Sequence, residues 1–236
     1  MESAFLIFIF LLILLIIVAV YILRQNAHQR SLIKSVTGLH RGTPSERELV
    51  LELLEESYHP QAIFHDLYIQ KKNGNYFQID LILATPQGLI IFEVKDYSGW
   101  LFANGRSTYW TQIMAYGTEK YRFYNPIVQN LRHIEELRKI SPQFSKIPIF
   151  SVVVFYGDNE FKAIENIPDN VFLIEPSQLP QTIENITTTN PKAMYTNKQE
   201  IASVLKLAHS NGDDPFIVNA HIEFVNSYKE KNGIPH

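Results

Sequence analysis

The 236-residue chain contains no cysteine. This absence excludes disulfide bonds and cysteine-ligated zinc, and it suits a reducing compartment. Internal repeats, a glycine-rich phosphate-binding loop and a Cys/His zinc spacing are also missing. The formal net charge of -3 excludes a global electrostatic attraction to nucleic acid, so any affinity for DNA requires a local basic surface.

Charge is absent from residues 3–23, which are mostly Leu, Ile, Val and Phe. A bilayer core requires about 20 apolar residues of helix, so this segment is predicted to be a transmembrane helix. A cleaved signal peptide is the alternative. The length of the run, Glu2 in place of a basic start, and the lack of a small-x-small cleavage site all favour the membrane helix.

Acidic residues are absent between Glu2 and Glu46, whereas this stretch contains Arg24, Arg30, Lys34 and Arg41. Basic residues beside a membrane helix mark its cytoplasmic side. We therefore expect a basic juxtamembrane linker over residues 24–41 and a single-pass protein held in the lipid bilayer. Its N-terminus would lie outside and its soluble domain in the cytoplasm. The linker could also touch anionic lipid or nucleic acid, although orientation alone explains it.

Two apolar segments, residues 76–84 and 89–94, are separated by the turn sequence Thr85-Pro86-Gln87-Gly88. This pattern predicts two antiparallel strands joined by a tight turn. Residues on both faces of the predicted hairpin are apolar apart from a few charged positions. The hairpin is therefore expected to be buried on both sides.

Three charged residues of this hairpin are predicted to share one face. With a loop at residues 86–87, Asp80 lies opposite Glu93, and Lys95 follows Glu93 on the same face. Buried like charges require a proton or a cation, and carboxylate ligands suit Mg²⁺ or Mn²⁺ better than zinc. An ordinary Asp80–Lys95 ion pair, with Glu93 reaching solvent, is the alternative interpretation.

A helix is predicted to begin upstream, with Thr43 as N-cap and Pro44 at its first position. Glu46 would complete a capping box. The apolar stripe of this helix places Glu46 toward the sheet, whereas Glu48, Glu52 and Glu55 are expected on the solvated side; the stripe consists of Leu49, Val50, Leu53 and Leu54. A capping role alone would also explain Glu46.

A third group of residues follows at Asn125-Pro126, which is predicted to start another helix with Asn125 as its cap. Gln129 and His133 are four residues apart and would share one face. Gln129 is therefore an accessory site candidate, Gln112 a weaker one, and His133 is expected to pack. Aromatic and basic residues between 100 and 124 could contact nucleic acid or could equally belong to the core.

The order of these motifs resembles the nuclease-related domain, NERD, over about residues 42–140. The resemblance rests on Glu46 at a helix start, Gln78-Ile79-Asp80, Glu93-Val94-Lys95 with Asp96-Tyr97-Ser98-Gly99, and Asn125-Pro126 with Gln129 and His133. The family usually has glycine where this chain has Ser45. Because the family belongs to the PD-(D/E)xK nuclease superfamily, the resemblance implies an α/β, restriction-endonuclease-like core with a mixed β-sheet flanked by helices.

The resemblance also implies a reaction and a site. Glu46, Asp80 and Glu93, with the backbone carbonyl of Val94, would hold Mg²⁺ or Mn²⁺, and Lys95 would orient water or stabilise the phosphate in the transition state. The implied reaction is hydrolysis of a nucleic-acid phosphodiester, with DNA favoured over RNA. Two alternatives stay open: a catalytically silent membrane-anchored nucleic-acid-binding or scaffold protein, and a phosphodiesterase for a nucleotide second messenger.

The remaining sequence predicts one domain with an extension. Residues 147–156 are expected to form a central strand and residues 171–174 a shorter one. After a polar stretch at 184–192, helices are predicted at 198–208 and 214–231. We thus expect a nuclease-related domain over residues 42–183 and a C-terminal helical extension over 184–236, which could pack on the domain or bind a protein partner.

Overall fold

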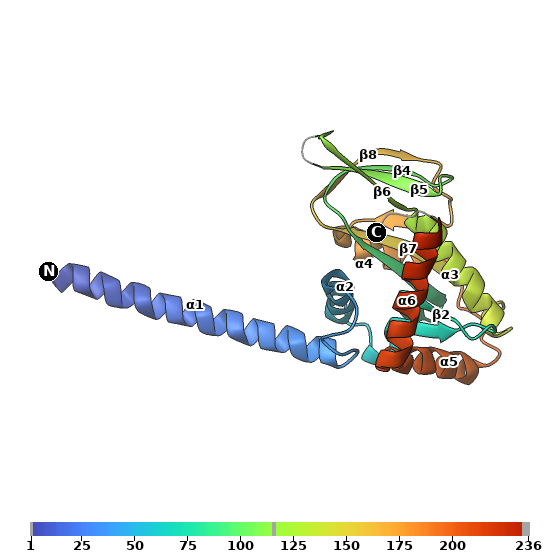
Figure 1. Ribbon diagram of the computed structural model, residues 1–236. Coiled ribbons are helices and arrows are strands. Elements are labelled where there is room, and N and C mark those ends of the chain that lie inside the picture. The colour runs from blue at the N-terminus through green and yellow to red at the C-terminus, as the bar shows by residue number, and fades with distance from the viewer. Residues whose placement is uncertain (1, 115–116, 233–236) are drawn as a thin grey trace.

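A computed structural model describes residues 2–114 and 117–232 of the chain (Figure 1). Its nine strands form two mixed sheets. The strands of the five-stranded sheet, in spatial order, are β1 (Ile63–Gln70), β2 (Tyr76–Thr85), β3 (Gly88–Asp96), β7 (Ile149–Tyr156) and β9 (Val171–Ile174). Those of the four-stranded sheet are β6 (Glu119–Tyr124), β5 (Tyr109–Met114), β4 (Gly99–Asn104) and β8 (Asn159–Glu165).

The predicted hairpin is the centre of the larger sheet. Strands β2 and β3 are antiparallel, with Thr85 paired to Gly88 and Leu81 to Phe92, so the expected register is confirmed. Strand β3 then pairs with β7 in parallel, which places β3 between two neighbours and buries both of its faces.

Helices cover both faces of this sheet. On one face, α2 (Pro44–Glu55) and α4 (Leu179–Thr189) pack apolar side chains against β3 and β7. On the other, α3 (Pro126–Ile140) and α5 (Lys198–Asn211) form a second apolar cluster with β1 and β2. Two short 3-10 turns, η1 (Pro60–Ala62) and η3 (Pro176–Gln178), connect elements. The predicted α/β class, with a mixed sheet flanked by helices, is confirmed.

The smaller sheet packs over the start of α3 and over strand β7 through a third apolar cluster, which is rich in aromatic residues. The indole of Trp110 stacks on Phe155 with ring centroids 5.9 Å apart, and Phe161 meets both rings edge-on. Trp110 therefore belongs to the core, whereas Trp100 on the same sheet is 38% exposed.

Helix α1 (Glu2–Lys34) projects away from the rest of the chain (Figure 1). It is long and apolar enough to cross a membrane, and its apolar window has no residue buried against the body. The basic linker expected over residues 24–41 is thus helical as far as Lys34. A turn then leads into α2, and Arg41 in this turn is buried.

The C-terminal helices join the body to different extents. Residues 184–189 of the polar stretch expected at 184–192 are part of α4, so the boundary expected between 183 and 184 falls inside that helix, whose Ile186 lies in the core. Helix α5 buries Ile201, Leu205 and Ala208 against the sheet. Helix α6 (Pro215–Asn232) contacts β2 but is largely exposed. A protein partner for these helices stays a prediction.

One sequence expectation about α2 is wrong. Glu52 was placed on the solvated side with Glu48 and Glu55, but it is half-buried and its carboxylate accepts a hydrogen bond of 3.2 Å from the Tyr156 hydroxyl. Strand β7 lies beyond the apolar stripe of α2, which a helical projection alone does not reveal. Burial raises the pKa of Glu52 to about 7.

The raised pKa of Glu52 predicts a pH-dependent stability. Between about pH 4.5 and 7 the folded protein keeps a proton that the unfolded chain releases, so this stabilising contribution is lost as the pH rises through 7. The variant Glu52→Gln should therefore gain on the order of 1 kcal/mol over the wild type at pH 8 relative to pH 5, allowing for solvent screening. Chemical denaturation of the full-length protein in detergent micelles measures this difference.

The exposed Glu55 on the same helix provides a matched control. Glu55→Gln should change the difference between pH 5 and pH 8 far less than Glu52→Gln does, because the charge of Glu55 raises the pKa of Glu52 less than burial does. Equal pH profiles for Glu52→Gln and the wild type would contradict the prediction.

Candidate active site

One cavity of about 520 Å³ opens between the start of α2, strands β2 and β3, helix α3 and helix α6. All six residues that the sequence singled out as site candidates line it: Glu46, Asp80, Glu93, Val94, Lys95 and Gln129. The fold therefore brings together residues that are up to 83 positions apart, counting from 46 to 129.

A change of face in strands β1 and β2 opens the sheet at this cavity. Ile79 of β2 belongs to the apolar cluster under α3 and α5, whereas Leu81, two residues later, belongs to the cluster under α2 and α4. The same switch occurs in β1 at Asp66, whose φ of 53° is in the left-handed region that non-glycine residues rarely adopt. Asp80 lies at this switch, so its side chain leaves the regular pleat and lines the cavity.

Asp80 is held by the neighbouring strand. Its Oδ2 accepts a hydrogen bond of 2.8 Å from the backbone N–H of Val94, beyond the last β2–β3 pair at Leu81 and Phe92. Burial, with the negative charges of Glu93 and Glu46 nearby, raises the pKa of Asp80 well above its usual range. The negative charges of Glu93 and Glu46 therefore act on Asp80, as the predicted grouping of these acids implies.

Glu93 and Lys95 form the ion pair at the base of the cavity. Lys95 Nζ lies 2.5 Å from Glu93 Oε1, and Glu93 is almost fully buried. Burial raises the pKa of Glu93 despite the lysine. Burial also opposes the charge of Lys95, but the carboxylates of Glu93 and Asp80 outweigh it and keep the pKa of Lys95 above its usual value. The alternative interpretation of the sequence, in which Lys95 pairs with Asp80 and Glu93 reaches solvent, is therefore wrong.

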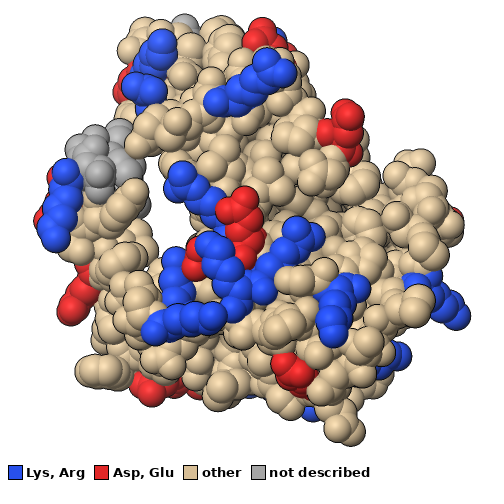
Figure 2. All heavy atoms as spheres, turned by 90° about the vertical axis from the view of Figure 1, so that its right-hand side faces the viewer, with Lys and Arg blue, Asp and Glu red and all other residues tan. Residues whose placement is uncertain are grey.

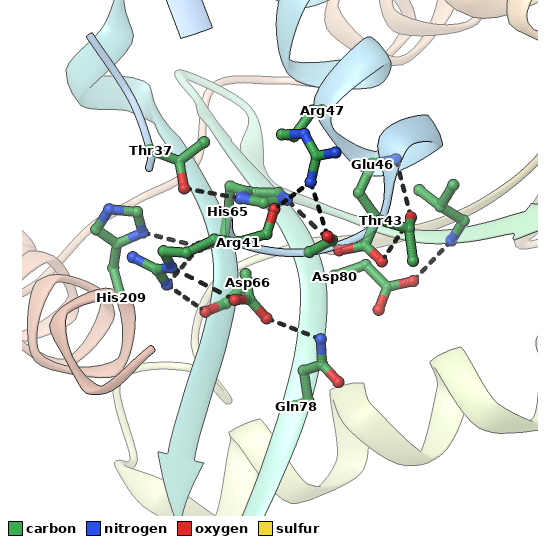
Figure 3. Close-up of polar contacts among 12 residues, drawn as sticks. Thr37, Arg41, Thr43, Glu46, Arg47, His65, Asp66, Gln78, Asp80 and His209 are labelled. Carbon is green, nitrogen blue, oxygen red and sulfur yellow. Dashed lines mark hydrogen bonds and ion pairs between the residues drawn. The ribbon is translucent and has the colours of Figure 1, made fainter. Parts of the chain in front are cut away.

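Glu46 is directed into the cavity by its position at the start of α2, whereas Glu48 is exposed. The Thr43 hydroxyl accepts from the Glu46 N–H at 3.2 Å and donates to Glu46 Oε1 at 2.9 Å. This cap differs from the predicted capping box, because the carboxylate binds the Thr43 hydroxyl. Figure 3 shows Glu46 and Asp80 close to each other at the start of this helix.

A buried polar network behind the acids was not foreseen from the sequence. His65 is fully buried, with Nε2 3.4 Å from Glu46 Oε2 and Nδ1 3.0 Å from the Thr37 hydroxyl. Gly42 fits here because a Cβ at this position would lie 2.5 Å from Glu46 Oε2, and its φ is 61°. The available signal was a polar His-Asp pair inside the apolar sequence of strand β1.

Arg41 links this network to the C-terminal part of the chain. Its guanidinium contacts Asp66 Oδ2 at 3.3 Å and Asp213 Oδ1 at 3.3 Å, and it donates to the backbone carbonyls of His65 and Asp66 (Figure 3). Gln78 donates to the other oxygen of Asp66 at 2.8 Å. These four contacts with Asp66, His65 and Asp213 hold the arginine in place. Arg41 therefore anchors the chain beside the cavity, in addition to its expected role as a basic residue near the membrane.

The remaining candidates take supporting positions. Gln129 accepts a hydrogen bond of 3.4 Å from Lys95 Nζ. Asn125 caps α3 as predicted, with Oδ1 accepting from the Ile127 N–H at 2.9 Å. His133 stacks on Phe77 and lies 3.7 Å from Glu93 Oε2, and burial lowers its pKa to about 3, so it is neutral. Gln112 donates to the backbone carbonyl of Ser98 and does not line the cavity.

The donor atoms fit a hard divalent cation by their chemistry. Glu46 Oε2 and Glu93 Oε2 are buried and have no hydrogen-bond donor, and carboxylate oxygens are the ligands that Mg²⁺ and Mn²⁺ prefer. Within residues 2–114 and 117–232, however, no three His, Cys, Asp or Glu side chains are placed to hold one ion together. The acids instead contact the Val94 N–H, Lys95 and His65.

The chain was compared with known proteins. An uncharacterized protein of Bacillus anthracis is 23% identical over 200 residues, which are 84% of this chain and 89% of that protein. No solved structure matches significantly. The family model of the nuclease-related domain, NERD, matches residues 41–156, a range that contains all six site candidates and excludes α6. On this match, the chain carries a domain of the NERD family.

Proposed function

We propose that this protein is a membrane-anchored, metal-dependent nuclease that hydrolyses phosphodiester bonds of DNA. The observation that carries the proposal is the grouping of Glu46, Asp80 and Glu93 with Lys95 around one cavity. Relatedness of the domain to nucleases supports the same conclusion.

The electrostatics of the cavity favour a cation ligand. Burial raises the pKa of Glu93 and of Asp80, which means that their negative charges are incompletely compensated by Lys95. Mg²⁺ or Mn²⁺ held by Glu46, Asp80, Glu93 and the Val94 carbonyl would supply this compensation, lower the pKa of a bound water and neutralise phosphate charge.

The chain itself supplies orientation and positive charge. Lys95 stays protonated because Glu93 and Asp80 face it, so its ammonium can stabilise negative charge on a phosphate. Gln129 holds Nζ of this lysine from helix α3. The Thr43 hydroxyl holds one oxygen of the Glu46 carboxylate by a hydrogen bond, and His65 Nε2 lies 3.4 Å from the other oxygen.

One observation favours a second candidate function, a silent nucleic-acid-binding or scaffold protein with the nuclease fold. The described side chains do not present a three-residue ligand set, and Lys95 already neutralises part of the charge of Glu93. In such a protein the acids and the lysine would be an internal polar cluster without turnover.

We expect the full-length protein in detergent micelles to cut labelled DNA when Mg²⁺ or Mn²⁺ is present and to stop when EDTA is added. Asp80→Asn and Lys95→Met should each lower the cleavage rate at least about 100-fold, since the first removes a proposed ligand of the metal ion and the second removes positive charge that would stabilise the transition state. Gel analysis of the cleaved DNA measures the rates.

Helix α2 offers a matched pair for this assay. Glu46→Gln should lower the rate, whereas Glu48→Gln changes an exposed acid two residues away and should not. Equal cleavage by the wild type, Asp80→Asn and Lys95→Met would sink the nuclease proposal.

Metal binding can be tested without turnover. Mn²⁺ at about 100 times its dissociation constant should stabilise the fold by about 2.7 kcal/mol, because the folded state alone holds the ion. Thermal melting with increasing Mn²⁺ should show an upward shift that the double variant Asp80→Asn/Glu93→Gln loses. A shift that survives in the double variant would place the ion elsewhere.

We further propose that α1 anchors the protein in a bilayer, with its N-terminal side outside and the folded body in the cytoplasm. Residues 3–23 supply the apolar span, and Arg24, Arg30 and Lys34 follow on the side of the body. Helix α1 continues past the apolar run to Lys34 and would hold the body away from the membrane surface.

The absence of cysteine makes this topology testable with single introduced thiols. In cells expressing the full chain, Ser3→Cys should react with a membrane-impermeant maleimide, whereas Asn73→Cys, in an exposed turn, should react only after lysis. Labelling of Asn73→Cys on intact cells would reverse the orientation. Recovery of a shortened, soluble protein would identify a cleaved signal peptide.

A further inference from the structure

Helix α6 forms one wall of the cavity that contains the acids. Pro215, Val218 and Asn219 of this helix line the same space as Asp80 and Glu93. This wall comes from outside residues 41–156, the region that matches the nuclease-related family.

Contacts at two points hold α6 in this position. In the turn before the helix, Asp213 binds the buried Arg41, and Gly212, the C-cap of α5, is so close to the guanidinium that a Cβ there would lie 2.0 Å from it. Further along, His221 Nδ1 lies 3.1 Å from the Tyr76 carbonyl oxygen, and its ring meets Tyr68 edge-on at 5.5 Å. Arg41, Gly212 and Asp213 at the first point, and Tyr68 at the second, line the cavity.

The apolar cores do not require α6. Of the described residues, those of α6 belong to none of the three buried clusters, and several of its large side chains face solvent. Phe216 is 81% exposed, Tyr228 52% and Ile222 47%. A helix that adds so little to the core, yet is held over the acids, acts on access to the cavity.

The composition of α6 excludes the role of a recognition helix that enters the DNA major groove. Helices that enter the DNA major groove carry basic residues for the phosphates. The first fifteen residues of α6, 215–229, contain one acidic residue, Glu223, and one basic residue, Lys229. Its exposed surface is largely apolar and uncharged.

We propose that α6 is a roof that admits a single strand of nucleic acid to the acids and excludes an intact duplex. The inference rests on the proposed nuclease function and adds the class of substrate. A cavity of about 520 Å³ holds a group the size of a nucleotide, whereas the major groove of a duplex alone is about 12 Å wide. A flexible strand can pass between α6 and the sheet, and a paired, rigid one cannot.

The surface on this side supports a path for a strand. Figure 2 shows Lys and Arg side chains around a hollow on one face of the molecule, with acidic side chains between them. Since the net charge of the chain is -3, this local positive surface is where a phosphate backbone would be attracted.

The test measures binding and cleavage of the same DNA in two forms. Full-length protein in detergent micelles is mixed with a fluorescent single-stranded oligonucleotide or its blunt duplex, first without divalent ions and then with Mn²⁺. We expect single strands to be bound and cut at least about tenfold better than duplex, because the roof excludes the duplex.

Two changes to α6 separate the roof from the rest of the site. A chain ending at Asp214 lacks α6 but keeps every buried cluster, so it should fold. Without the roof, duplex cleavage should rise, and single strands should be bound and cut no more than about threefold better than duplex. Val218→Trp narrows the cavity and should weaken single-strand binding about fivefold or more. Phe216→Trp adds bulk on the same helix outside the cavity and should change neither.

The outcomes distinguish this inference from the proposed function. Equal binding of single strands and duplex by the wild type would contradict the proposal that α6 excludes a duplex, even if the protein cuts both. An unchanged preference in the folded chain that ends at Asp214 overturns it as well. A strong single-strand preference in binding that the shortened chain loses, without cleavage under any metal condition, supports the roof and overturns the nuclease.

Discussion

Three carboxylates of like charge share one partly enclosed cavity, and their mutual repulsion is the constraint around which this protein is organised. Burial strengthens the repulsion because little water is present to screen it. Lys95 offsets part of the charge, and the Val94 N–H stabilises Asp80 by a hydrogen bond. Burial, together with the remaining repulsion between the carboxylates, raises the pKa of Asp80 and Glu93. A site in this condition is suited to a divalent cation and to the phosphate groups that such a cation binds.

Keeping these acids in place requires a backbone that departs from a regular sheet. The left-handed φ of Asp66 and the exchange of core faces at Asp80 open the ladder where the cavity begins. Strained backbone of this kind persists when the surroundings determine it fully. Arg41 provides that restraint through Asp66 and two backbone carbonyls, and Gln78 occupies the remaining oxygen of Asp66.

The same anchor connects three parts of the chain that are distant in sequence. Arg41 follows the end of α1 by seven residues and reaches both strand β1 and the start of α6. Thr37, still closer to α1, contacts His65, which in turn faces Glu46. The segment between α1 and the domain is therefore built into the wall of the site. An enzyme arranged in this way would have its anchor, its acids and its roof in one network.

Local rules in the sequence determined the hairpin, its register and the order of its acids, because turn chemistry and strand alternation depend on neighbouring residues. They also determined the start of α2 at Thr43, the start of α3 at Asn125 and the apolar length of α1. Through its resemblance to the nuclease-related family, the sequence indicated six of the residues that line the cavity. These patterns are short-range, so one strand or one helix contains all the information they need.

Only the tertiary structure decided the rest, since it depends on contacts between distant segments. The half-buried position of Glu52 depends on strand β7, and the pairing of Glu93 with Lys95 depends on how deeply β3 is buried. The roles of Arg41, His65 and Asp66 required the turn after α1 to meet strand β1. The placement of α6 over the acids required Asp213, in the turn before this helix, to reach Arg41 from 172 positions away, a contact that no local pattern of residues encodes.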